Sequence, residues 1–151
     1  MTATTTGSVD TSSYPTPAVS VARMFYDRVG ATPGAEAFRF PAQGGWVSVT
    51  WAETAEIVKT TAAGLLALGI GPEERVAIAS ATRVEWLYAD LAIMCAGAAT
   101  TAVYPSTGSE GVAFILSDSG ARVVFAEDQA QIAKLRAQRG HLSDVIRVVT
   151  F

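Results

Sequence analysis

From residue 50 onward, stretches with the helical spacing of apolar residues alternate with short runs rich in β-branched residues. This alternation is typical of a parallel sheet covered by helices, because each connection between parallel strands needs the length of a helix. The predicted helices span residues 51–68, 83–96, 109–117 and 129–139, and the predicted strands span 75–80, 100–104, 121–126 and 145–151. We therefore expect an α/β fold, with a mostly parallel sheet flanked by helices in a flavodoxin-like three-layer arrangement.

The residues before position 50 predict something different. Residues 1–16 are rich in Thr, Ser and Pro and lack the basic and apolar segments of a secretory signal, so we expect a disordered arm. A helix is predicted over residues 19–29. The stretches 38–40 and 46–50, separated by Pro41, Gly44 and Gly45, predict a short N-terminal hairpin. The folded unit is then expected to cover residues 17–151.

Four helix starts carry the pattern of a capping box, in which a Ser, Thr or Asp side chain and a Glu or Gln three residues later bond to each other's backbone N–H. The four pairs are Thr50 with Glu53, Thr82 with Glu85, Thr107 with Glu110, and Asp128 with Gln131. At the end of the helix over 51–68, Gly69 is the expected left-handed cap.

The apolar pattern also predicts which helices are buried. The helix over 51–68 places one apolar face inward, whereas the helix over 83–96 is apolar nearly all round and should be central. The most apolar run covers only residues 91–103, shorter than the roughly 20 residues of a membrane span. It reads better as a buried helix followed by a buried strand, and no membrane span is expected.

Composition excludes several classes of protein. A formal net charge of -3 gives no basic surface for nucleic acid, which is not an expected partner. One cysteine, Cys95, and one histidine, His141, cannot form an intramolecular disulfide or a Cys/His zinc site. A reducing, cytoplasmic setting fits best, with at most a peripheral contact to membrane.

Two glycine-containing loops invite a functional interpretation. The segment 69–71 has the Gly-x-Gly of a dinucleotide motif, but it follows a predicted helix and precedes a strand, which favours a structural cap. The segment 106–111 lies between a strand and a helix, where backbone N–H groups can hold an anion. No Lys or Arg follows it and Glu110 stands in the first helical turn, so a plain capping turn is favoured.

Single residues with a possible chemical role have simpler explanations. Asp90, in an apolar helix, is a candidate acid or base, but such a residue more often accepts a hydrogen bond from a neighbouring segment or pairs with Arg. Cys95 lacks an activating partner and is expected to be a small buried hydrophobe. The tryptophans are expected to pack the core rather than a ligand: Trp46, Trp51 and Trp86.

Several stretches together resemble the opening of adenylate-forming enzymes. They are residues 47–53 (VSVTWAE), 63–70 (AGLLALGI), 74–80 (ERVAIAS), 81–86 (ATRVEW), 89–98 (ADLAIMCAGA), 103–105 (VYP) and 118–127 (DSGARVVFAE). These segments are most similar to those of long-chain fatty acid–CoA ligases, and the resemblance covers about residues 20–151.

The resemblance implies a reaction in which a fatty acid attacks ATP to give acyl-AMP and pyrophosphate, after which CoA displaces AMP. ATP, Mg²⁺ and CoA are therefore expected cofactors of a full-length enzyme. The family's phosphate loop ending in Pro-Lys-Gly, its ribose-binding Asp and its late catalytic Lys belong to sequence beyond residue 151. We therefore assign no catalytic, cofactor-binding or metal-binding residue to this chain, and we expect it to be a truncated first subdomain without activity of its own.

Two other readings stay open. The chain could be a stand-alone flavodoxin-like binding module, or a non-catalytic protein that binds fatty acid or a partner through the exposed face of its sheet. The expected partners of the ligase reading are the fatty acid, the missing remainder of the enzyme and, through an exposed apolar face, a second copy in a homodimer.

Overall fold

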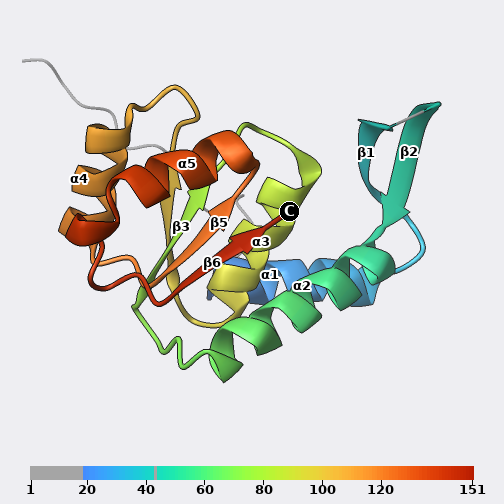
Figure 1. Ribbon diagram of the computed structural model, residues 1–151. Coiled ribbons are helices and arrows are strands. Elements are labelled where there is room, and N and C mark those ends of the chain that lie inside the picture. The colour runs from blue at the N-terminus through green and yellow to red at the C-terminus, as the bar shows by residue number, and fades with distance from the viewer. Residues whose placement is uncertain (1–18, 43) are drawn as a thin grey trace, which may run out of the picture.

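The structure, a computed structural model, describes residues 19–42 and 44–151 (Figure 1). The predicted arm over residues 1–16 lies outside the described residues. Along the chain the elements are α1 (Val21–Ala31), β1 (Glu36–Ala42), β2 (Gly45–Thr50), α2 (Trp51–Ala67), β3 (Arg75–Ala79), α3 (Val84–Cys95), β4 (Ala99–Val103), α4 (Ser109–Ser119), β5 (Val123–Ala126), α5 (Gln129–Ala137), a 3₁₀ turn (Arg139–His141) and β6 (Arg147–Thr150). Every predicted helix and strand is present, with bounds that differ from the prediction by a few residues.

Four strands form a parallel sheet in the order β4-β3-β5-β6. The first strand of the series lies inside, its successor lies on one side of it and the later two lie on the other, which is the flavodoxin-like order. The prediction of a mostly parallel sheet is confirmed. β4 and β6 form the two edges of this sheet.

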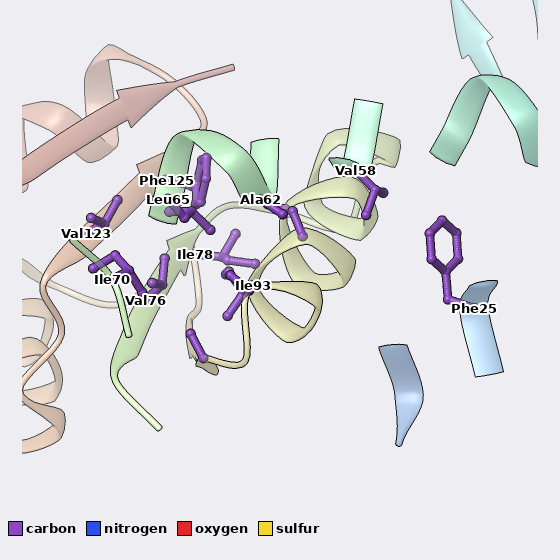
Figure 2. Close-up of a cluster of buried hydrophobic side chains, with 14 of the residues drawn as sticks. Phe25, Val58, Ala62, Leu65, Ile70, Val76, Ile78, Ile93, Val123 and Phe125 are labelled. Atoms are coloured by element: carbon purple, nitrogen blue, oxygen red, sulfur yellow. The ribbon is translucent and has the colours of Figure 1, made fainter. Parts of the chain in front are cut away.

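Helices cover both faces of the sheet, so the predicted three layers are also confirmed (Figure 1). On one face, α2 and α3 pack against Val76, Ile78, Val123 and Phe125, and Figure 2 shows Leu65 of α2 and Ile93 of α3 beside the side chains of β3 and β5. The helix α1 joins the same cluster through Phe25 and packs on α2 and α3. On the other face, α4 and α5 pack against Ala77, Ala79, Val124 and Ala126. Alternate residues of one strand thus enter two separate cores, as the period of a strand requires.

The helix α3 is enclosed as its composition predicts, since none of its residues is exposed. The strand β4 that follows it is not the buried strand expected from the apolar run over 91–103. Within β4 only Val103 is buried, because β4 lies at an edge of the sheet. No helix in the described part of the chain has both the length and the apolarity needed to cross a bilayer.

The β1–β2 hairpin forms a separate antiparallel sheet that extends away from the rest of the molecule (Figure 1). Its residues are exposed or half-buried, and the Trp46 side chain is 70% exposed. The expectation that Trp46 packs in the core is wrong. Trp51 and Trp86 do pack against the core on the side of α2 and α3, which we call the first core. The Trp51 ring centroid lies 6.2 Å from that of Phe25.

Three helices end in the same kind of turn. After α2, the N–H of Gly69 bonds to the carbonyl of Leu66 and the N–H of Ile70 bonds to that of Leu65, which is the Schellman pattern. The corresponding pairs recur after α3 and after α4, at Gly97 and Ala98 and at Gly120 and Ala121. Gly69 has φ +80°, so the cap predicted at this position is confirmed.

The helix starts confirm one capping box completely. Thr50 accepts from the Glu53 N–H at 3.2 Å, and the Glu53 carboxylate accepts from the Thr50 N–H at 2.8 Å. Asp128 caps α5 by accepting from the Gln131 N–H, but the Gln131 side chain accepts from Lys134 instead of returning the bond.

The other two predicted boxes are wrong. The N-cap residues are Arg83 and Gly108, one position later than the predicted Thr82 and Thr107, and neither makes a side-chain cap bond. This shift moves Glu85 and Glu110 from the third to the second helical position, from which a carboxylate cannot complete the box.

Candidate functional site

The carboxyl ends of the four parallel strands meet at one edge of the sheet, which is where open α/β sheets bind ligands. The residues that follow the strands there are Ser80 and Ala81 after β3, Tyr104 and Pro105 after β4, Glu127 and Asp128 after β5, and Phe151 after β6. We call this region the carboxyl edge and take it as the candidate site.

At the centre of the carboxyl edge, Glu127 joins the ends of β3 and β5. One of its carboxylate oxygens accepts from the Ala81 N–H at 2.8 Å, and its own N–H donates to the Ala79 carbonyl at 3.0 Å. The crevice between β3 and β5 is the topological switch point, the usual ligand position in this fold. In this chain the Glu127 carboxylate bonds to the Ala81 N–H beside this crevice.

Arg83 is the cation of this crevice, and two carboxylates neutralise it. Its guanidinium forms a two-point contact with Glu85, at 2.6 and 2.8 Å, and lies 3.6 Å from Glu127. The hydrogen bond from Arg83 holds the pKa of Glu85 below its usual value. The same guanidinium lies 5.7 Å from the centroid of the Phe151 ring, within the range of a cation–π contact. Arg83 therefore connects the start of α3 with the residues that follow β5 and β6. Its charge is balanced by the carboxylates of Glu85 and Glu127.

The loop over residues 106–111, flagged in the sequence as a possible anion cradle, is a packed turn. The Thr107 N–H donates to the Tyr104 carbonyl, and a side chain at Gly111 would have its Cβ 2.9 Å from the Thr107 methyl carbon. A side chain at position 111 would therefore force Thr107 to move. The Lys134 ammonium approaches this loop, but it donates to the Pro105 carbonyl and to the Gln131 side chain.

The described residues of the carboxyl edge do not fit a Mg–ATP site. Phosphates require free cations or a set of free backbone donors, and both nearby cations, Arg83 and Lys134, are held by protein acceptors. No group of three or more potential metal-ligating side chains was found among residues 19–42 and 44–151. The interpretation that any ATP-binding groups lie in other sequence stays a prediction.

The remaining candidate residues have structural surroundings. Asp90 accepts from the Thr100 hydroxyl of β4 at 2.7 Å, as expected for a carboxylate bonded by a neighbouring segment. Cys95 is half-buried against the first core, and burial raises the pKa of its thiol. His141 lies exposed in the 3₁₀ turn and bonds to Gln138. The structure does not bring these residues together into one site.

Beside Phe151, an apolar groove of about 530 Å³ opens between α2, α3 and the end of β6. Its lining includes Ile57, Leu68, Tyr88 and Val149, and the Phe151 ring stacks on that of Phe125 at 6.1 Å. Among the residues that the structure describes, Glu85, already paired with Arg83, is the one carboxylate in the lining. This groove can accept an apolar side chain or chain, but it carries no free charge to orient one.

Sequence reasoning missed the Arg83–Glu127 tie and the Lys134 contact. Residues separated by more than forty positions make the first contact, and no local spacing signals it. Arg83 and Glu85, two residues apart, are a local signal of an ion pair, but this segment also has the pattern of a helix start.

Comparison with known proteins now identifies the class. The model of the family described as "AMP-binding enzyme" matches residues 25–151. The chain therefore belongs to this family.

Within the family, the chain is 35% identical over 132 residues to the long-chain-fatty-acid–CoA ligase FadD15 of Mycobacterium bovis, a match that covers 85% of this chain and 22% of the relative. It superposes on the solved fatty acyl CoA synthetase of Mycobacterium tuberculosis with a TM-score of 0.79 and 27% identity, over 87% of this chain and 26% of the other. The anthranilate CoA ligase AuaEII, at 18% identity and a TM-score of 0.80, shares the fold. The chain thus spans about a fifth to a quarter of the length of these relatives.

Proposed function

We propose that this chain is the N-terminal segment of an ATP-dependent long-chain fatty acid–CoA ligase and that it is inactive when isolated. The observation that carries the proposal is the identity of 35% over 132 residues to a ligase of this kind, of which the chain spans only 22%. The expected reaction of the whole enzyme converts fatty acid, ATP and CoA to acyl-CoA, AMP and pyrophosphate. The acid, ATP, Mg²⁺ and CoA then belong to the whole enzyme.

The charges of the carboxyl edge support the second half of the proposal. A phosphate-transferring site stabilises developing negative charge with cations and N–H donors. At this edge Arg83 contacts two carboxylates, and Lys134 contacts a carbonyl. The folded unit over residues 17–151 then serves as a scaffold in a cytoplasmic enzyme with at most a peripheral membrane contact.

The test is ATP–pyrophosphate exchange with palmitate, measured on the purified chain. We expect no exchange above the rate without protein, and we expect exchange from a longer chain that continues through the phosphate loop. Palmitate-dependent exchange by the 151-residue chain would contradict the claim of inactivity. Failure of the longer chain with every fatty acid tried would contradict the ligase assignment.

The flavodoxin-like strand order keeps one alternative function available, a stand-alone binding module. Such a module would use the crevice between β3 and β5, where Glu127 already bonds to Ala81. Binding of fatty acid alone is the other alternative, and the apolar groove beside Phe151 is the place for it. Titration with a fluorescent long-chain acid separates these cases, because the scaffold reading predicts weak binding or none.

A further inference from the structure

We draw no further inference here: the strongest candidate, the apolar groove of about 580 Å³ lined by Met24 of α1, Trp51 of α2 and Leu91 of α3, carries nothing because the chain spans only about a fifth to a quarter of the length of its relatives and nothing in the structure shows what covers this groove.

Discussion

The inner strands and the hairpin are both β-structure, yet they relate to the rest of the molecule in opposite ways. Every residue of β5 is buried, and in β3 only Arg75 is not. In β2, four of the six residues are exposed and none is buried. The alternating sequence of β2 predicts a half-buried strand, but the hairpin extends away from the layers that cover the central sheet (Figure 1). An alternating pattern therefore indicates a strand without fixing how much that strand contributes to stability.

The largest effect should come from the centre of the sheet. Ile78 of β3 is fully buried, so Ile78→Ala leaves a cavity and should lower the free energy of unfolding by about 2–5 kcal/mol. Urea denaturation followed by circular dichroism measures this change. The comparison variant is Val47→Ala in β2, for which a loss of about 0.5 kcal/mol or less is expected. Similar losses at the two positions would remove the distinction between the two sheets.

The second-largest effect is expected at the junction between the hairpin and α2. Thr50 ends the hairpin and caps α2 with a complete box, so Thr50→Ala should lower the free energy of unfolding by about 1 kcal/mol. Thr50→Ser keeps the hydroxyl and should retain most of that stability. If both variants lose the same amount, the methyl group and not the cap bond matters at this position.

A smaller, pH-dependent contribution lies at the other end of the sheet. Glu74 accepts from the Gly71 N–H at 2.6 Å and from Arg122 at 2.7 Å, and these bonds hold the pKa of its carboxyl below the usual value. A lowered folded-state pKa gives stability that is present above the unfolded-state pKa of about 4.3 and is lost as pH falls through the folded-state pKa. Glu74→Gln should therefore lower stability at pH 7 and lose less between about pH 5 and pH 3 than the unmodified chain.

Chemical denaturation at several pH values checks this expectation. The control is Glu56→Gln on the exposed side of α2, which should leave the pH profile close to that of the unmodified chain. Parallel profiles for the Glu74 variant and the unmodified chain would contradict a role for Glu74 at low pH.

The smallest effect is expected at the most exposed tryptophan. Trp46→Ala should change the free energy of unfolding by less than about 0.5 kcal/mol, because 70% of this side chain already faces solvent. The same substitution at Trp51, which packs against Phe25 and Phe38, should cost several times more. A large loss at Trp46 would show that the hairpin stabilises the isolated chain.

The sequence predicted the fold well because its signals are local. Helical spacing over 51–68 predicts one inward face, and the residues with this spacing, Ala55, Val58, Ala62 and Leu65, are buried. Gly69 marks the end of that helix. The capping boxes at Thr82 and Thr107 failed because the helices start one residue later, and the spacing alone does not fix which residue has the extended backbone of an N-cap.

The candidate site was less accessible to prediction. The contact of Glu127 with Ala81 and Arg83 depends on two strands lying side by side, which is a tertiary fact. The exposure of Trp46 follows from the separate position of the hairpin, and that of β4 from its place at the edge of the sheet. Apolar composition predicted burial in both cases. It reflects how often a residue type is buried, and it does not show whether another segment packs against that residue in this fold.

The repeated turn at Gly69, Gly97 and Gly120 sets a rule for any redesign of this molecule. Each turn ends a helix and places a buried residue, Ile70, Ala98 or Ala121, immediately after the glycine. Lengthening any of these turns would displace that buried residue from the core. Fusion tags, loop grafts and spectroscopic labels therefore belong at the opposite end, where the segment after Val103 carries an exposed Tyr104.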